Sequence, residues 1–515
     1  MKIKRNIGRI AFVICLCTTV MMGCKKFLTV EPIDRLTGNN FYQSKEDVEA
    51  NIARIYSQFF EKLNESWVIG AIGEARSGEI FNSPTAGTDR MILRDLGTNN
   101  MNAVYNNTLS GGRSQGYAMY KVSIWDTYYK VIQSCNILIS KLEEGIPGLS
   151  ASDKDRYKAE ATFMRCLSYF WMVRLYGDVV YYTDAYFAKQ LPREDMVSVI
   201  SKSIADLESV KDIMPWTFGE SSQRGARASR GSIIALLMHM KMWNANFDSP
   251  NATKYYESVA SLGKELRASG VHHLYKLTPE EWAKVSKGRT EESLFEFYRT
   301  INYDDQNNAY APLWDHFLRW PYKFPRYNQQ FSIAYYSSIF MYRIYPLNGP
   351  ADKRKELWYE DMYANDGLFV LKKFAANVFA SGNEDSNPDN TFMIFRYADA
   401  LLLEAEALAN LGAAREAEAI TVLNIVRDRA EAPRYAGGGT DLKNFIFEER
   451  CRELIGEGAR YFDLIRTRRI LNPQWTMNPM TIDQYNRRAW TWPLDASAKN
   501  FNSKIVLNDY WTGGN

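Results

Sequence analysis

Carboxylates and arginines alternate in the segment FEERCRELIGEGARYFDLIR, residues 447–466, and such a spacing could serve acid–base chemistry. Glu449, Glu453 and Glu457 recur at every fourth residue, so they would share one face of a helix. An acid catalyst needs a raised pKa, however, and the interleaved arginines would hold these carboxylates ionised. We therefore interpret the segment as an ion-pair network that fixes helices, and it provides no catalytic residue.

Local ion pairs are expected within the same segment, because residues three apart lie on one face of a helix. The expected pairs are Arg450 with Glu453, Glu457 with Arg460, and Asp463 with Arg466.

Other residue types rarely stand in catalytic or metal-binding arrangements. The chain has four histidines, and it contains neither the GxSxG motif of serine hydrolases nor the HExxH motif of zinc proteases. His239 lies in an apolar helical stretch and is expected in the core, and the adjacent His272 and His273 could not share a metal on a helix. No CxxC or Cys/His cluster has zinc spacing. We therefore expect a protein that is not an enzyme and has no cofactor or metal site, while a role for calcium stays open.

Two further features have a structural and a functional interpretation. Cys135, Cys166 and Cys451 lie far apart in helix-like stretches and are expected to be buried thiols, although one disulfide is possible in an oxidising compartment. The stretch SQRGARASRG, residues 222–231, could bind phosphate but lacks a P-loop pattern. We expect it to lead into the buried helix that follows. Without a basic surplus elsewhere, nucleic-acid binding is not expected.

Aromatic residues crowd an irregular insert, residues 276–390, and suit recognition of sugars. The chain has 32 Tyr, 26 Phe and 13 Trp. Sugar rings expose C–H groups on their faces and hydroxyls at their edges, so flat rings would cover the faces while polar groups bond the edges. Prolines near these rings break helices and keep them on loops. The candidate ligand-binding residues here are Asp304, Asp305, Asn307, Trp314, Trp320 and Tyr322.

The N-terminus resembles a bacterial lipoprotein signal. A basic start is followed by 13 apolar residues, IAFVICLCTTVMM, which are too few for a membrane span. Gly23 and Cys24 follow, and the resemblance implies that Cys24 is acylated and becomes the first mature residue. Met21 departs from the Leu or Val more common there. Removing residues 1–23, which carry four basic residues and no acid, changes the formal charge from +3 to −1.

Helical periodicity dominates the rest of the chain and predicts a mainly α fold. Ser44 and Asp47 form a helix start, followed by Val48, Ile52, Ile55 and Phe59 on one face. Further helices are expected at 120–142, 152–176, 230–243, 252–268, 391–411, 413–430 and 441–457. Short connections favour helical hairpins that resemble tetratricopeptide repeats, without a clean 34-residue period. A loop-rich segment, 64–118, and the insert interrupt them.

Several stretches resemble the SusD/RagB family of surface lipoproteins of Bacteroidetes. They are AEATFMRCLSYFWMVRLYGDVV (159–180), FRYADALLLEAEALANLG (395–412), LNIVRDRA (423–430), the segment 447–466 and WPL (492–494). Val180 stands where the family commonly has Pro. The ordered set spans nearly the whole chain and implies a signal peptide at 1–23, an N-terminal SusD-like region at 24–270 and a C-terminal SusD/RagB region at 271–515.

The resemblance implies capture of a nutrient without chemistry. A lipid-anchored protein facing the cell exterior would bind an oligosaccharide and pass it to a SusC-like TonB-dependent transporter of the outer membrane. In the family, ligand loops come from the insert and from the N-terminal loop region, which here contains Trp67 and Tyr105. The alternatives left open are a peptide-capturing member, a glycoside hydrolase and an adaptor that binds only proteins.

Overall fold

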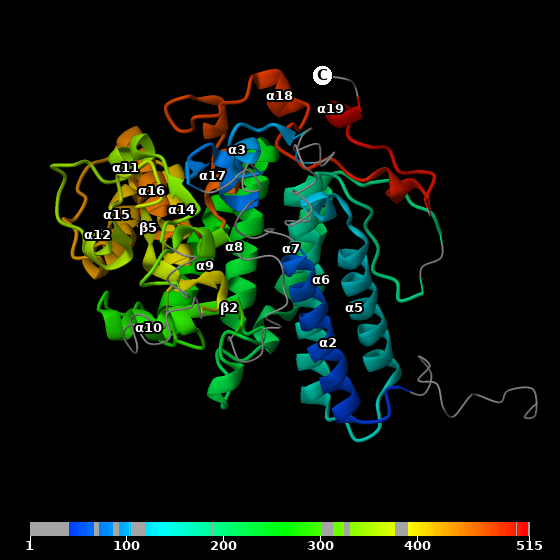
Figure 1. Cartoon of the computed structure of the whole chain (residues 1–515). Helices are drawn as coiled ribbons and strands as arrows, with labels where there is room; N and C mark the ends of the chain where they lie inside the picture. Colours follow the sequence, from blue (N-terminus) through cyan, green and yellow to red (C-terminus); the bar gives the residue numbers. More distant parts are fainter. Residues whose placement is uncertain are drawn as a thin grey trace, which may run out of the picture.

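The chain is mainly α-helical, as the sequence predicts, and its strands are short (Figure 1). The computed structural model describes residues 41–65, 72–85, 92–101, 104, 119–186, 189–299, 313–323, 330–375, 390–500 and 502–512. The longer helices are α2 (Lys45–Asn64), α5 (Asp126–Glu144), α6 (Ala151–Tyr176), α7 (Met196–Val210), α8 (Arg230–Phe247), α9 (Ala252–Ala268), α14 (Tyr397–Asn410), α15 (Ala413–Arg429) and α16 (Gly439–Glu453). The shorter ones are α3 (Ile92–Gly97), α10 (Pro279–Lys287), α11 (Ser338–Ile344), α12 (Lys353–Trp358), α17 (Arg460–Arg466), α18 (Ile482–Asn486) and α19 (Asp509–Thr512).

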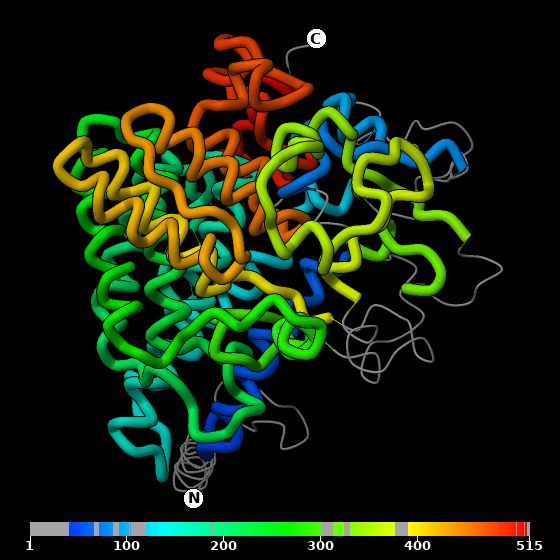
Figure 2. The backbone as a smooth tube through the Cα atoms, turned by 90° about the vertical axis from the view of Figure 1, so that its left-hand side faces the viewer, coloured from blue at the N-terminus to red at the C-terminus, as the bar shows by residue number. Residues whose placement is uncertain are grey.

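The longer helices pack side by side in chain order and form a helical-hairpin scaffold (Figure 2). Helix α5 packs on α6, and contacts continue through α7, α8 and α9 to α14, which also contacts α15 and α16. Only Leu411 and Gly412 separate α14 from α15, so these two helices run antiparallel. The scaffold is therefore the expected stack of helical pairs, and the insert is attached to one side of it.

Local signals placed several helix ends correctly. The Ser44 hydroxyl accepts from the Asp47 amide at 3.3 Å and caps α2, whose predicted apolar face is buried. Ser229 and Ser232 form a capping box at the start of α8, and α8 is buried nearly all round. Helix α6 ends at Gly177, which has a φ of 74° that favours glycine.

One predicted helix begins with a strand instead. We expected a helix from 391, but Phe392–Arg396 forms β6, which pairs antiparallel with β2 (Ser293–Phe297). Both strands are almost wholly buried, so their sequences show no alternation of polar and apolar residues. A short buried strand cannot be distinguished from a buried helix by periodicity, and the partner strand lies about a hundred residues away.

The predicted helix at 441–457 ends early. Helix α16 stops at Glu453, and Gly456 and Gly458 follow with φ of 79° and 81°. A Cβ at Gly456 would lie 2.6 Å from the Phe374 ring, so close packing also favours glycine there. The break separates α16 from α17 and changes which charges can meet.

Two short strand pairs organise the insert. Strand β1 (Ile80–Asn82), from the N-terminal loop region, pairs antiparallel with β3 (Ala334–Tyr336). Strand β4 (Tyr359–Glu360) pairs with β5 (Val370–Leu371). The two irregular parts of the sequence therefore lie side by side, as the blue and yellow-green tubes show in Figure 2.

Buried ion pairs fasten the insert to the C-terminal helices. Arg354 of α12 donates to Glu449 at 2.7 Å and to Glu453 at 2.9 Å. Arg396, at the end of β6, reaches Glu453 at 3.0 Å and Glu457 at 2.7 Å. These glutamates therefore pair with residues far away in the sequence, and the interpretation as a structural network is confirmed.

Of the three ion pairs predicted between residues three apart in the segment 447–466, one forms. Asp463 and Arg466 pair at 2.7 Å, as expected from their spacing. The other two expected pairs do not form: Arg450 donates to Asp463 and to Asp399, and Arg460 donates to Glu79. Arg450 and Glu453 both lie in α16, but each pairs with residues from other elements. Glu457 lies beyond the end of α16 and therefore no longer continues its helical face.

The larger of two hydrophobic clusters among the described residues extends through both predicted regions. The same cluster of buried side chains includes Val48 of α2, Leu237 of α8, Phe395 of β6 and Ile465 of α17. The division at 270 stays a prediction. Within the described residues, no helix is both long and apolar enough to cross a bilayer.

Candidate functional site

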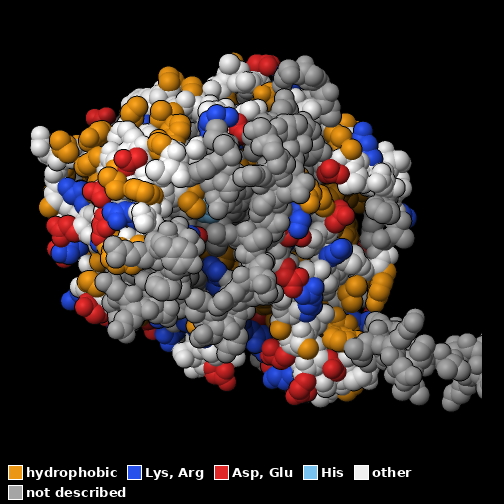
Figure 3. All heavy atoms as spheres, viewed as in Figure 1, with side chains coloured by type: hydrophobic (Ala, Val, Ile, Leu, Met, Phe, Trp, Pro, Cys, Tyr) orange, Lys and Arg blue, Asp and Glu red, His pale blue; other side chains and the backbone are white. Residues whose placement is uncertain are grey.

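Exposed apolar side chains gather on one face of the insert, which we call the insert surface. Trp320, Phe331 and Leu368 are 38%, 45% and 44% exposed. Isolated exposed apolar residues are ordinary, but several on one surface mark an interaction site. Figure 3 shows hydrophobic side chains interspersed with charged ones on the left-hand part of the molecule, where the insert lies.

Arg319 holds two of these residues in place. Its Nε donates to the Leu368 carbonyl at 3.2 Å, and its Nη1 donates to the Trp320 carbonyl at 3.3 Å. Its Nη2 donates to the Asp361 carboxylate at 3.2 Å. The guanidinium therefore fixes the backbone under both apolar side chains and leaves a charged pair at their edge.

Phe331 and two hydroxyls from the N-terminal loop region all lie close to Gly367. A Cβ at Gly367 would lie 2.6 Å from the Phe331 Cβ and 3.0 Å from the hydroxyl oxygens of Ser83 and Thr85. The Ser332 amide donates to the Gly367 carbonyl at 2.9 Å. The absence of a side chain at Gly367 allows this close approach and places hydrogen-bonding groups beside an exposed ring.

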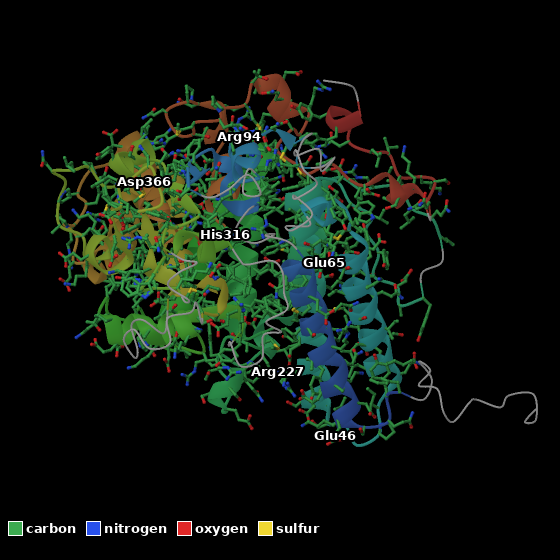
Figure 4. All side chains as sticks on the ribbon, viewed as in Figure 1. Glu46, Glu65, Arg94, Arg227, His316 and Asp366 are labelled. Carbon is green, nitrogen blue, oxygen red and sulfur yellow. The ribbon has the colours of Figure 1, made fainter. Side chains whose placement is uncertain are left out.

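Two more rings and a carboxylate extend the insert surface. Phe81 and Tyr335 stack with centroids 6.0 Å apart, across the β1–β3 pair. The Asp366 carboxylate accepts from the Leu368 amide at 2.8 Å. Figure 4 places Asp366 on the left of the molecule, well away from Glu46 and Glu65 at the two ends of α2.

Tyr322, a predicted ligand residue, supports the surface from beneath. Its hydroxyl donates to the Glu360 carboxylate, and the Lys372 ammonium lies 5.6 Å from its ring centre. Burial and the Glu360 carboxylate raise the pKa of Tyr322 above its ordinary value. Because its hydroxyl and one ring face are occupied, we assign Tyr322 a positioning role.

Trp314, also a predicted ligand residue, lies in the core. It is 4% exposed, and its ring packs 5.5 Å from Phe374 and 4.7 Å from Phe392, measured between centroids. Packing therefore occupies this ring, so Trp314 is left out of the proposed ligand set. Of the three predicted rings that the structure describes, Trp320 is the one on the surface.

The other predicted residues lie outside the described part of the chain. They are Cys24, Trp67, Tyr105, Asp304, Asp305 and Asn307. Sequence reasoning missed Phe331 and Leu368, because Phe331 stands alone between polar residues and Leu368 begins the apolar run LFVL, which is typical of a buried segment. The Asp366–Gly367 dipeptide before Leu368 is a turn signal that could have indicated an exposed loop there.

Residues that might have suggested catalysis or anion binding have structural partners. Burial acts to raise the pKa of Glu449, but Arg354, Arg452 and Arg427 lower it to about 2. The arginines of 222–231 pair with carboxylates: Arg224 with Glu291, Arg227 with Glu49 and Glu160, and Arg230 with Glu265. The segment leads into α8, as expected, and its arginines also connect it to neighbouring elements through ion pairs.

The histidine and cysteine predictions agree with the structure. His239 lies within the helix stack and contacts Asp399 at 2.6 Å. Cys135, Cys166 and Cys451 are free and buried. Burial raises the pKa of Cys135 to about 12, so this thiol is unreactive. In the described part of the chain, no group of three His, Cys, Asp or Glu residues is placed to hold a metal ion.

A helical-hairpin scaffold that presents rings and fixed hydrogen-bonding groups on loops defines a ligand-binding protein. Comparison with known proteins gives its family. Residues 348–511 match the SusD family, and residues 41–240 match a family described as starch-binding associating with the outer membrane. The chain belongs to the SusD/RagB family.

Relatives match nearly the whole length of the chain. A SusD homolog from Bacteroides thetaiotaomicron is 36% identical, with a TM-score of 0.81 over 92% of this chain and 99% of that one. SusD-like protein P38 of Formosa agariphila is 24% identical over 96% of this chain and 97% of its own. Surface glycan-binding protein A of Bacteroides thetaiotaomicron, solved with laminarihexaose, is 18% identical, with a TM-score of 0.65 over 90% and 100% of the two chains.

Proposed function

We propose that this protein captures an oligosaccharide on the insert surface and passes it to a SusC-like TonB-dependent transporter. The protein would be anchored to the outer membrane by acyl chains on Cys24 and would face the cell exterior. It would bind its ligand without chemistry. The SusD/RagB family consists of SusD-like binding proteins, and the description of one family match includes association with the outer membrane.

The observation that carries the proposal is the composition of the insert surface. Trp320 and Phe331 supply exposed ring area, and Arg319 and Asp361 supply a fixed charged pair beside them. Rings can cover the apolar faces of sugars, while charged and hydroxyl groups bond their edges. Glycan binding by a relative of the same fold, solved with laminarihexaose, supports an oligosaccharide as ligand.

The proposal is tested with purified mature protein and a panel of laminari-oligosaccharides, malto-oligosaccharides and other soluble glycans. We expect at least one glycan to bind by isothermal titration calorimetry and to be recovered intact by chromatography after long incubation. Trp320→Ala should weaken that binding about tenfold or more while the thermal unfolding midpoint changes little. Unchanged affinity in this variant would remove Trp320 from the site.

The same experiment separates the alternatives. A glycoside hydrolase needs two carboxyl groups about 5–10 Å apart, one of them with a raised pKa. At the insert surface, the Asp361 carboxylate instead pairs with the Arg319 guanidinium at 3.2 Å. Appearance of shorter sugars would show hydrolysis, and binding of peptides in place of glycans would identify a peptide-capturing member.

A further inference from the structure

A cavity lies between α18 and the segment before α19. Figure 1 shows these two helices at the top of the molecule. The volume of the cavity is about 440 Å³, and we call it the basic pocket. That volume falls within the roughly 300–1,000 Å³ of small-molecule sites. Four cationic side chains and one carboxylate line it. They are Arg193, Arg487, Arg488, Lys504 and Asp178.

The turn that ends α6 builds the wall of the basic pocket. Arg193 donates to the carbonyls of Tyr176 at 2.6 Å, Asp178 at 2.7 Å and Val506 at 2.9 Å. All three acceptors are neutral carbonyls, so the guanidinium is fixed without an ion pair to any described carboxylate. Burial lowers the pKa of Arg193, the nearby Arg488 acts in the same direction, and Asp178 opposes them.

Arg488 is also held in a defined position. Its Nη1 lies 2.5 Å from the Asp178 carboxylate, and its Nη2 lies 3.7 Å from Asp195. Gly177 leaves the space for it, since a Cβ there would lie 3.2 Å from Arg488 Nη1. Arg488 has a φ of 62°, which is uncommon for a residue with a side chain and occurs often at binding sites.

The remaining two cations are weakly compensated. Arg487 lies 3.7 Å from Asp483, a carboxylate that is itself mostly exposed, and it packs 5.3 Å from the centre of the Tyr510 ring. Lys504 is exposed and has no ion pair with any described residue. Asp178 is already paired with Arg488, so the pocket keeps a positive surplus at Arg193, Arg487 and Lys504.

We propose that the basic pocket binds a sulfate or carboxylate group carried by an acidic saccharide. Guanidinium groups donate paired hydrogen bonds to such oxyanions, and a lysine adds a point charge. The pocket has more room than a bare ion needs, which favours an ion attached to a sugar ring. The anion site stands on its own geometry, whereas its assignment to a saccharide rests on the proposed function.

The test is a ligand-observed NMR titration of the full mature protein with glucose 6-sulfate, glucuronate, inorganic sulfate and glucose. We expect glucose 6-sulfate or glucuronate to bind more tightly than either inorganic sulfate or glucose. Lys504→Ala with Arg487→Ala should weaken this binding at least about tenfold, and added NaCl should weaken it as well. Both side chains reach solvent, so the variant should keep its fold.

Matched variants make the result decisive. Lys254→Ala and Arg434→Ala remove exposed cations elsewhere and should leave binding within about twofold. Trp320→Ala should also leave binding of glucose 6-sulfate and glucuronate at the basic pocket unchanged. Glycan binding at the insert surface and anion binding at the basic pocket can therefore fail separately. Equal affinity for glucose and glucose 6-sulfate, or no loss in the double variant, would overturn the anion site. Equal affinity for inorganic sulfate and glucose 6-sulfate would overturn the saccharide assignment.

Discussion

The Nη1 of Arg354 lies 2.9 Å from the Oε2 of Glu453, and both side chains are fully buried. Arg354 belongs to the insert and Glu453 ends α16, so this contact joins the insert to the helical scaffold. Burial acts to raise the pKa of Glu453, but Arg429, Arg396 and Arg354 hold it far below its ordinary value. The carboxylate is therefore ionised and needs these partners.

Replacing Arg354 should destabilise the fold strongly. Arg354→Met leaves Glu449 and Glu453 with fewer cations in a buried site, and breaking a buried pair in this way costs about 3–5 kcal/mol. Urea unfolding should show this loss in the free energy of unfolding. The control is Arg434→Met, which breaks an exposed pair with Asp428 and should change stability by about 0.5 kcal/mol or less. Similar losses in the two variants would contradict the role of the buried network.

Glu74 should make stability depend on pH. It is buried, it accepts from the Gly458 amide at 3.0 Å, and burial raises its pKa to about 8. The ordinary value is about 4.5, so the folded protein keeps a proton that the unfolded chain releases above that pH. The stability that this bound proton contributes is fully present below about pH 4.5 and is lost as the pH rises to about 8. Between these two values the free energy of unfolding falls by about 1.4 kcal/mol per pH unit.

Glu74→Gln should remove that pH dependence, since a glutamine stays neutral. We expect urea unfolding between pH 5 and 8 to give a flatter profile for the variant than for the wild type, with a residual slope from Glu296, whose pKa burial raises to about 7. Glu356→Gln changes an exposed carboxylate and serves as the control. An unchanged slope in Glu74→Gln would show that Glu74 is ionised in the folded protein.

Phe331 should contribute to ligand affinity more than its isolated position in the sequence suggests. Phe331→Ala removes an exposed ring that packs beside Gly367, and we expect a loss of about 1–2 kcal/mol in glycan binding by calorimetry. Ile482→Ala removes an apolar side chain that is 53% exposed on α18, outside the insert, and it should leave affinity unchanged. Equal effects of the two variants would argue against a localised site.

Cys24 should decide attachment to the membrane. Cys24→Ala should release the protein from the membrane fraction, because acyl chains supply the anchoring energy at about 0.8 kcal/mol per buried methylene group. Labelled fatty acid should appear on the wild-type polypeptide and be absent from the variant. Fractionation at high salt excludes purely electrostatic binding. A variant that still pellets with membranes would refute the lipid anchor.

Local signals in the sequence determined the scaffold. The cap at Ser44, the capping box at Ser229 and the glycine at 177 act within a few residues of the helix ends that they define. The pairing of Asp463 with Arg466 follows from helical spacing alone. The resemblance to the SusD/RagB family also rests on short ordered stretches that can be read directly from the chain.

Contacts between residues far apart in the sequence determined the charge pairing and the burial of side chains at the insert. Glu453 takes its partners from Arg354, Arg396 and Arg429, and only folding brings them together. Trp314 and Trp320 are six residues apart and have the same side chain, yet one lies in the core and the other on the surface. Spacing along a chain fixes geometry over one or two helical turns, whereas burial and charge pairing at the insert depend on strands and helices that meet only in the folded protein.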